Sequence, residues 1–320
     1  MFMLFKTRRA WNMTNDEILK TKKCPNSPNT VGANGATFGI GDSSFFRHSC
    51  FVIRHFFLVV AVAGPMICGP GSAQSGPAVG AGAGGRRTNS LGQVFVPVPG
   101  TSVLFCVWDT RVQDYMAFAS KTHREWPKAD FAQEPTHPAV NVSWDDAQAF
   151  CAWLTEKEHK KGSLKKSETY RLPTDAEWSL AVGLTNEPPG MPADKNQKVR
   201  GIYPWGRGWP PPKGSGNFAD QTLSAKKKDA YSVIEGYDDG YADTSPVGAF
   251  APNRYGLFDM GGNVWQWCDD WYDANQHDRV LRGGSCVCVP RMLLLSWRNH
   301  FSPAQIYNYI GFRCVLAGAP

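Results

Sequence analysis

The stretch from Tyr255 to Trp267 constrains this chain most, because it combines two tryptophans, a pair of glycines and several oxygen-bearing side chains. Trp265 and Trp267 are two residues apart, so both rings point to the same side of an extended backbone. Rings of this size need packing partners, which predicts that the segment lies in a core covered by other elements. Gly261 and Gly262 favour a sharp turn, or a close approach of two backbones, directly before it.

This segment resembles the core motif of the formylglycine-generating enzymes, a family also called sulfatase-modifying factors. The resemblance extends over roughly residues 140–316 and includes, in order, Arg171–Trp178, Tyr203–Gly206, Arg282–Ser285 and Gly311–Cys314. It implies an α+β fold, a C-type-lectin-like variant with much irregular chain. We expect this domain to occupy residues 91–318.

Residues 1–90 are expected to form a leader outside the domain. Residues 1–50 show no sustained periodicity and are rich in Gly, Ser, Asn and Thr, which predicts disorder. The apolar run within residues 47–73 is too short for a comfortable membrane span and is typical of a signal peptide. Residues 69–90 have the composition of a flexible linker. We therefore expect export, periplasmic or secreted, and otherwise a cytoplasmic protein; a membrane anchor and a tail without a targeting role are the alternatives for the apolar run.

The formal net charge of +6 is concentrated in the leader. Residues 1–55 hold eight Lys and Arg against three Asp and Glu, whereas residues 91–320 hold 24 basic and 25 acidic residues. A domain without net positive charge argues against a nucleic-acid partner, and no stable membrane span is expected in the mature chain. The histidines of the domain do not pair at helical spacing, which argues against a three-histidine iron site.

Local patterns predict several elements of the domain. Two strands are expected within 94–100 and 102–108, joined by a Pro-Gly turn. Three helices are expected to begin at caps with a polar side chain three positions later: Thr110 with Gln113, Ser143 with Asp146, and Thr174 with Glu177. Residues 185–250 are rich in Gly, Pro, Asn and Asp, so a segment of this length needs aromatic anchors or a metal to order it.

The resemblance implies two calcium sites. The first is matched by Asn217, Phe218, Asp239 and Tyr241, and the second by Asp259, Gly262, Val264 and Gln266. Carboxylate, amide and carbonyl oxygens are the ligands that Ca²⁺ prefers. Gln266 stands where the family has Glu, so we expect weaker binding at the second site. The alternative is that Asn217 and Asp239 are turn residues that hydrogen-bond to their own backbone.

Active relatives oxidise a cysteine of a substrate peptide with oxygen and copper(I), which two cysteines hold. The first of these cysteines is matched by Cys288, three residues after Ser285, but the second is matched by Leu293 and the histidine that follows the first by Val289. Cys286 is the candidate for the missing ligand, because thiolates suit copper(I). The alternative is that Cys286 and Cys288 are buried as small hydrophobic residues.

The resemblance also implies a disulfide between Cys151 and Cys314. Such a bond would close a loop of about 160 residues and would stabilise the fold by about 4–5 kcal/mol on the chain-entropy model. It requires an oxidising compartment, in agreement with the predicted export signal. The alternative is that Cys151 packs on the apolar face of its helix.

Two functions of different classes follow from these patterns. The first is a calcium-stabilised scaffold that presents a groove to a protein, peptide or other ligand, near Ser285, Cys288, Trp297, Arg298 and Asn299. The second is an oxygen- and copper-dependent oxidase of a protein cysteine, in which Cys288 acts with Cys286 and beside Ser285. The absent second cysteine favours the scaffold, and the order of the motifs favours the oxidase.

Overall fold

The computed structural model describes residues 85–228 and 231–318. The chain divides into two units, Met1–Gly71 and Ser72–Pro320, and the described residues belong to the second. The predicted disorder of residues 1–50, the signal-like segment 47–73 and most of the linker 69–90 lie outside the described residues.

A five-stranded antiparallel sheet combines strands from both ends of the described chain. Its order is β1 (Arg87–Thr88), β2 (Val94–Pro97), β3 (Val103–Cys106), β9 (Val315–Ala317) and β4 (Thr169–Arg171). The predicted hairpin of β2 and β3 is confirmed. The sheet begins at Arg87, four residues before the expected domain boundary, and Arg87 Nη1 lies 2.6 Å from Glu168 Oε1.

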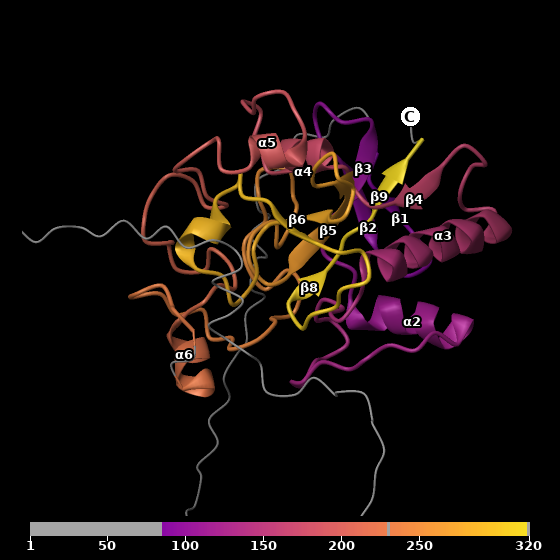
Figure 1. Ribbon diagram of the computed structural model, residues 1–320. Helices are drawn as coiled ribbons and strands as arrows, with labels where there is room; N and C mark the ends of the chain where they lie inside the picture. Colours follow the sequence, from indigo (N-terminus) through magenta and orange to yellow (C-terminus); the bar gives the residue numbers. More distant parts are fainter. Residues whose placement is uncertain (1–84, 229–230, 319–320) are drawn as a thin grey trace, which may run out of the picture. The chain divides into compact units, whose positions relative to one another are not determined.

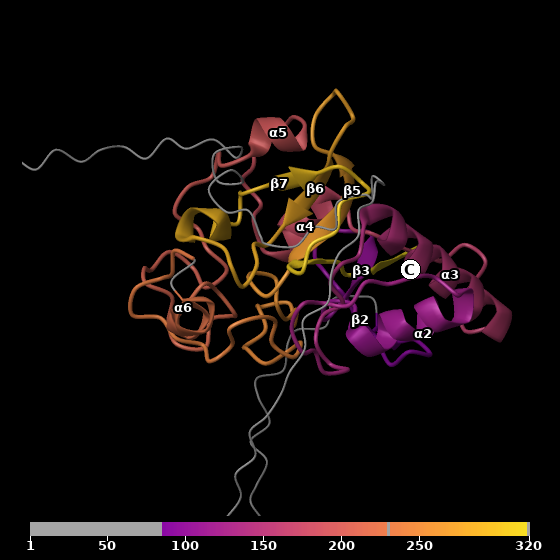
Figure 2. The same ribbon diagram turned by 60° about the horizontal axis from the view of Figure 1, so that its bottom comes forward.

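A second sheet holds the tryptophan pair. Its order is β7 (Asn299–Phe301), β6 (Arg279–Arg282), β5 (Trp265–Trp271) and β8 (Ile310–Gly311), and β5 and β8 are parallel. Figure 2 shows β5, β6 and β7 next to one another. Trp265 and Trp267 are buried, and Trp267 Nε1 donates to the carbonyl of Val142 at 3.0 Å. The predicted buried, extended segment is confirmed.

The helices lie around these sheets. They are α2 (Val112–Thr122), α3 (Trp144–Lys161), α4 (Asp175–Ala181), α5 (Pro192–Lys195) and α6 (Gln221–Lys227), with a 3₁₀ turn η1 at Pro290–Leu293. Helices α2 and α3 lie side by side, and α6 lies at the opposite end of the domain in the long irregular region (Figure 1). The fold is α+β with much irregular chain, as expected.

Two of the three predicted helix caps are confirmed. Ser143 accepts from the backbone N–H of Asp146, and Thr174 accepts from that of Glu177. In each case the side chain of the partner accepts from the backbone N–H of the cap residue. The prediction for Thr110 was wrong, because the N-cap of α2 is Arg111, whose backbone N–H donates to Asp114. The Thr110 side chain is buried instead.

Aromatic anchors order the irregular segment 185–250. The rings of Tyr203 and Trp205 stack with centroids 5.0 Å apart and planes 4° apart, and Trp205 also contacts Phe218. The hydroxyl of Tyr237 donates to the carbonyl of Gly216 at 2.6 Å. Hence buried or stacked rings at intervals hold a chain that has few regular hydrogen bonds.

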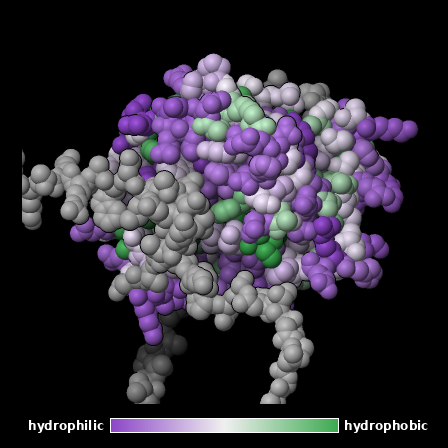
Figure 3. All heavy atoms as spheres, in the orientation of Figure 1, coloured by the Kyte–Doolittle hydropathy of each residue, from purple (hydrophilic) through white to green (hydrophobic). Residues whose placement is uncertain are grey.

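The described surface is mostly hydrophilic. The face in Figure 3 shows small, separate hydrophobic areas among charged and polar side chains. Among residues 85–228 and 231–318, the exposed large hydrophobic side chains are Met116, Met191, Trp209 and Ile306. Within residues 85–228 and 231–318, no helix has the length and apolarity needed to cross a membrane.

Candidate functional site

A close backbone crossing joins three of the sequence motifs. The backbone N–H of Gly262 donates to the carbonyl of Gly283, and that of Asn263 donates to the carbonyl of Asn217. Gly262 has a φ of +81°, and a Cβ at this position would lie 2.2 Å from the carbonyl oxygen of Asn217. Glycine is therefore required here for both conformation and space. This crossing positions the residues predicted for both calcium sites.

The structure brings together the four residues predicted for the first calcium site. Asp239 accepts from the backbone N–H groups of Phe218, at 2.8 Å, and Tyr241, at 3.0 Å. Asn217 is fully buried, and its amide nitrogen donates to the carbonyl of Asp243 at 2.7 Å. Its amide oxygen, Oδ1, is buried without a hydrogen-bond partner.

This unpartnered oxygen and its surroundings fit a bound cation. Burial, together with the nearby carboxylate of Asp220, raises the pKa of Asp239 to about 7. A buried acceptor without a donor is costly, and a cation would satisfy it while favouring the ionised form of the acid. No group of three or more His, Cys, Asp or Glu side chains in the described part of the chain is arranged to hold a metal. A site of one amide, one carboxylate and two carbonyls is not of that kind.

The residues predicted for the second calcium site also lie close together, and two of their oxygen atoms accept hydrogen bonds from other protein groups. The amide nitrogen of Gln266 donates to the carbonyl of Asp259 at 2.7 Å. Its oxygen accepts from Trp178 Nε1 at 3.0 Å and from Arg313 Nε at 2.8 Å. Arg313 also donates to the carbonyls of Phe258 and Asp259. Hydrogen bonds within the protein thus occupy Gln266 Oε1 and the carbonyl of Asp259, two oxygen atoms that could otherwise bind a metal at this site.

The two candidate cysteines are buried thiols. Cys288 Sγ lies 3.2 Å from the backbone nitrogen of Ser285, which donates to it, and 3.3 Å from Ser285 Oγ. Burial raises the pKa of Cys288 to about 11 although the contacts to Ser285 lower it. Burial also raises the pKa of Cys286, and Cys288 adds to the effect. Both side chains are therefore neutral thiols at pH 7.

Leu293 occupies the space beside Cys288. A Cβ built on Gly284 would lie 2.7 Å from Leu293 Cδ2 and 3.8 Å from Cys288 Cβ. Both side chains therefore border the same space next to Gly284. Leu293 is fully buried at the end of η1. Where the family resemblance places a second thiol, this chain therefore has a packed hydrocarbon side chain.

The groove predicted around these residues is closed in this structure. Ser285, Cys288 and Trp297 are buried, and Arg298 has no exposed surface. Of the predicted residues, Asn299 alone is partly exposed. The sequence motif identified residues that pack together, but they do not line an open surface.

Arg298 belongs instead to a buried ionic network around Asp175. Its guanidinium contacts both carboxylate oxygens of Asp175 at 2.9 Å and Glu187 at 2.7 Å. Arg282, which also has no exposed surface, pairs with Asp175 and donates to the carbonyl of Leu295 at 2.8 Å. One carboxylate thus links α4, β6 and the segment that precedes β7.

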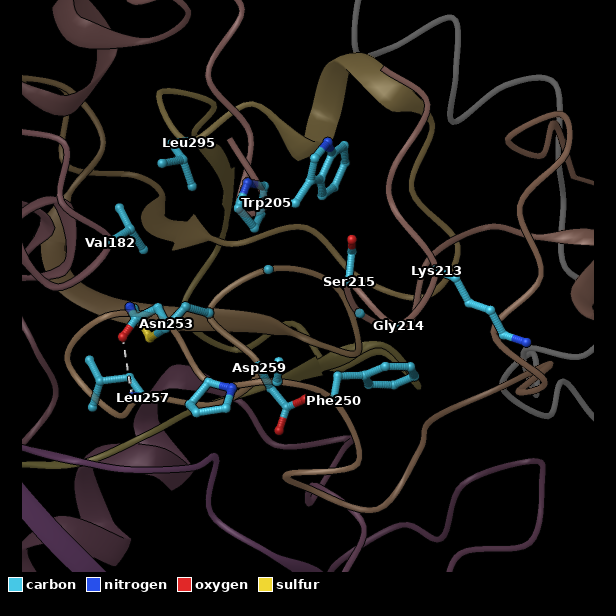
Figure 4. Close-up of a pocket in the computed structure, with 16 residues that line it drawn as sticks. Val182, Trp205, Lys213, Gly214, Ser215, Phe250, Asn253, Leu257, Asp259 and Leu295 are labelled. Carbon is cyan, nitrogen blue, oxygen red and sulfur yellow. Dashed lines mark hydrogen bonds between the residues drawn. The ribbon is translucent and has the colours of Figure 1, made fainter. Parts of the chain in front are cut away.

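An open cavity of about 280 Å³ lies on another side of the Gly262 crossing. Its lining comes from residues 204–205, 213–216, 250–253, 257 and 259–261, with Val182 and Leu295. In Figure 4, Trp205 and Leu295 lie on one side of it, and Asp259 and Phe250 lie on the other. Sequence reasoning marked Trp205 and Asp259 for other roles and missed the cavity that they share.

A buried charge cluster adjoins Asp259 of the cavity lining, whose backbone carbonyl accepts from Arg313. Arg313 Nη2 is 3.1 Å from Asp109 Oδ1, and neither residue has exposed surface. Neither carboxylate oxygen of Asp109 has a well-aligned hydrogen bond. Burial raises the pKa of Asp109 to about 7 and that of Asp259 to about 6, although Arg313 lowers both.

Cys151 and Cys314 meet inside the core. Their sulfur atoms are 3.5 Å apart, both residues are buried, and both are free thiols in this structure. The predicted pair is thus brought together. Its oxidation remains a prediction.

The family is decided by comparison with known proteins. The model of the family described as "Sulfatase-modifying factor enzyme 1-like domain" matches residues 88–317. The chain belongs to this family. Apart from Arg87 in β1, the match covers both sheets and the motifs around Gly262, so the expected fold and family are confirmed.

Curated relatives include active and inactive members of the family. The formylglycine-generating enzyme of Thermomonospora curvata is 31% identical over 211 residues, which cover 59% of this chain and 59% of that protein. The formylglycine-generating enzyme of Bos taurus is 29% identical over 221 residues, 63% of this chain and 50% of that protein. The "Inactive C-alpha-formylglycine-generating enzyme 2" of Bos taurus is 32% identical over 204 residues, 61% of this chain and 55% of that protein. The matched region therefore spans 50–59% of the length of these relatives.

A solved structure shares the fold. PvdO from Pseudomonas aeruginosa superposes with a TM-score of 0.51 and 19% identity, and the match covers 73% of this chain and 98% of PvdO. Identity at this level shows the common fold alone.

Proposed function

We propose that this chain is a ligand-binding member of the sulfatase-modifying-factor family that does not oxidise cysteine. The observation that carries this proposal is that the buried side chain of Leu293 fills the space next to Gly284 and Cys288. A copper(I) ion held by two thiolates needs a second sulfur at that place, and an isobutyl group cannot supply a ligand.

The state of the remaining thiols supports the same conclusion. Metal ligation by cysteine uses the thiolate, and burial raises the pKa of both Cys286 and Cys288. A relative at 32% identity is named as an inactive formylglycine-generating enzyme, which supports the idea that members of this family can lack the cysteine-oxidising activity. The competing function is an oxidase of a protein cysteine in which Cys286 replaces the missing ligand. Its support is the position of Cys286 two residues from Cys288, together with the contact between Ser285 and Cys288.

Copper(I) titration against a chromophoric chelator decides between these functions. We expect the wild-type chain not to compete for one equivalent of copper(I), because one thiolate at a buried site cannot hold it tightly. Leu293→Cys should gain tight one-to-one binding, since it restores two thiols at the motif positions.

Matched variants make the titration specific. Adding Cys288→Ser to Leu293→Cys should remove the gained binding, and Leu293→Ala should not bind. Stoichiometric binding by the wild type that disappears in both Cys286→Ser and Cys288→Ser would contradict the proposal and favour the oxidase.

We further propose that calcium binds at the first predicted site. Asn217 and Asp239 would supply side-chain oxygens, and Phe218 and Tyr241 would supply carbonyl oxygens. The unpartnered Oδ1 of Asn217 and the raised pKa of Asp239 support this assignment. The ion would offset the buried negative charge and tie residues 217–218 to residues 239–241.

Calcium should therefore raise thermal stability. At 100 times the dissociation constant, binding adds about 2.7 kcal/mol, which corresponds to roughly 5–10 °C in a domain of this size. Differential scanning calorimetry with calcium and with chelator measures the shift. Asp239→Asn should abolish most of the shift, whereas Asp278→Asn, outside the site, should keep it. An unchanged shift in Asp239→Asn would place any bound calcium elsewhere.

A further inference from the structure

We propose that the cavity beside Gly262 binds an organic cation, such as the ammonium or guanidinium group of a peptide side chain or a small amine, with Asp259 as its counter-ion. This inference rests on the proposed ligand-binding function and names the chemistry of the ligand. It concerns a cavity that no sequence motif predicted.

The size and lining of the cavity suit a small ligand. Its volume of about 280 Å³ is near the lower end of the range for ligand sites. Its walls combine apolar groups, the rings of Trp205 and Phe250 and the side chains of Leu257 and Met260, with polar groups that include Asp259. Aromatic faces attract cations through the ring quadrupole, and this attraction is strongest for tryptophan.

The indole of Trp205 is held rigidly in this wall. Its Nε1 donates to the carbonyl of Gly208 at 2.8 Å. Tyr203 stacks on it at 5.0 Å, and Phe218 packs against it at 60° with centroids also 5.0 Å apart. A ring fixed before binding costs little further conformational entropy when a ligand arrives.

Most polar side chains of the lining already have partners within the protein. Asn253 donates to the carbonyl of Ala181 and accepts from the backbone N–H groups of Tyr255 and Leu257. Ser215 Oγ donates to the carbonyl of Pro212. Lys213 lies at the edge and its side chain extends away from the cavity in Figure 4. Asp259 is therefore the charged group available to a ligand.

The charge balance around Asp259 favours a positive ligand. Asp259 uses Oδ2 to accept from the backbone N–H of Gly248 at 2.8 Å, and no hydrogen bond to Oδ1 is found among the described residues. Arg313 is paired with Asp109 at 3.1 Å, and its hydrogen bond to Asp259 goes to the backbone carbonyl and not to the carboxylate. A buried charge without full compensation is unfavourable, and a bound cation would provide the missing charge.

The same contacts disfavour a metal ion as the occupant. The carbonyl of Asp259 accepts from Gln266 and Arg313. A hard cation requires six or more oxygen ligands, whereas Asp259 supplies the one carboxylate among the lining residues of this cavity. An organic cation uses both the carboxylate and the rings.

Isothermal titration calorimetry of the full chain with two probes of equal size tests the proposal. Benzylammonium carries the charge, and benzyl alcohol is its neutral counterpart. We expect benzylammonium to bind roughly tenfold more tightly, the gain of a cation over an equal-sized neutral group at a carboxylate with aromatic walls. Asp259→Asn should bind both probes equally, because its amide oxygen can still accept from Gly248 while the charge is lost.

Further variants separate the outcomes. Trp205→Leu should lower the affinity for both probes. Asp278→Asn, which lies outside the cavity, should change neither affinity. The proposal would be overturned if the wild type bound both probes with equal affinity, or if it did not bind benzylammonium at millimolar concentration. It would also be overturned if Asp259→Asn still preferred the charged probe. One-for-one displacement by calcium would also overturn it, since Asp259 would then be a metal ligand. The copper titration is independent of these results, so a failure here is distinguishable from a failure of the proposed function.

Discussion

Asp175→Asn should destabilise the domain by about 3–5 kcal/mol, because it leaves two buried guanidinium groups without their shared counter-ion. Arg282 and Arg298 have no exposed surface, and both pair with this one carboxylate. Globular domains are stable by about 5–15 kcal/mol, so the loss should be visible as a large shift in urea unfolding. Asp278→Asn is the matched control, because its partly exposed pair with His300 should contribute less than about 1 kcal/mol.

The same network predicts an acid-dependent loss of stability. Burial acts to raise the pKa of Asp175, but Arg282 and Arg298 outweigh it and hold the pKa below its ordinary value. A group with a lowered pKa stabilises the folded state above its unfolded pKa, near 4, and loses this contribution as the pH falls through the folded pKa. Unfolding curves from pH 7 to 3 should therefore fall less steeply for Asp175→Asn than for the wild type. Parallel curves, or an Asp175→Asn variant as stable as Asp278→Asn, would show that the network does not hold these elements together.

Oxidation of Cys151 and Cys314 should stabilise the domain by about 4–5 kcal/mol. The sulfur atoms already lie 3.5 Å apart, and the residues are separated by 163 positions, so a bond would restrict a long loop of the unfolded chain. Each thiol would lose one proton and one electron to an oxidant such as oxidised glutathione. Since both thiols are buried, the bond should form during refolding in a glutathione buffer rather than in the native state.

Unfolding with and without reductant measures this effect. We expect wild type refolded in the oxidising buffer to lose stability on reduction, and Cys151→Ser to show the same stability in both conditions. Cys268→Ala is the control, because Cys268 is a buried free cysteine elsewhere in the core. A wild type whose unfolding does not respond to reductant would mean that the pair packs as two thiols.

Features encoded within a few neighbouring residues could be predicted from the sequence. The caps at Ser143 and Thr174 and the burial of Trp265 and Trp267 follow from local hydrogen bonding and side-chain size. The cap predicted at Thr110 was wrong for a reason that local sequence does not contain, because the Thr110 hydroxyl is buried 3.9 Å from Cys314 Sγ, 204 residues away.

The site itself depends on such distant contacts. The motif around Cys288 suggested a groove, but Leu293 and Trp297 close it by packing. The cavity combines segments from residue 182 to residue 295, and no periodic pattern relates them. Likewise, the pairing of Asp109 with Arg313 crosses most of the described chain. The sequence showed which side chains could bind a ligand or a metal. Tertiary packing decides which of these side chains are exposed and which groups they contact.

The place of β9 between β3 and β4 has a consequence for synthesis. Residues 315–317 fill the gap between two strands that the ribosome produces much earlier. Until translation has passed residue 317, β3 and β4 each keep an unpaired edge that invites aggregation. The five-stranded sheet of the nascent domain therefore cannot be completed until residues 315–317 have been synthesised. Chaperones that shield strand edges should matter most before that point.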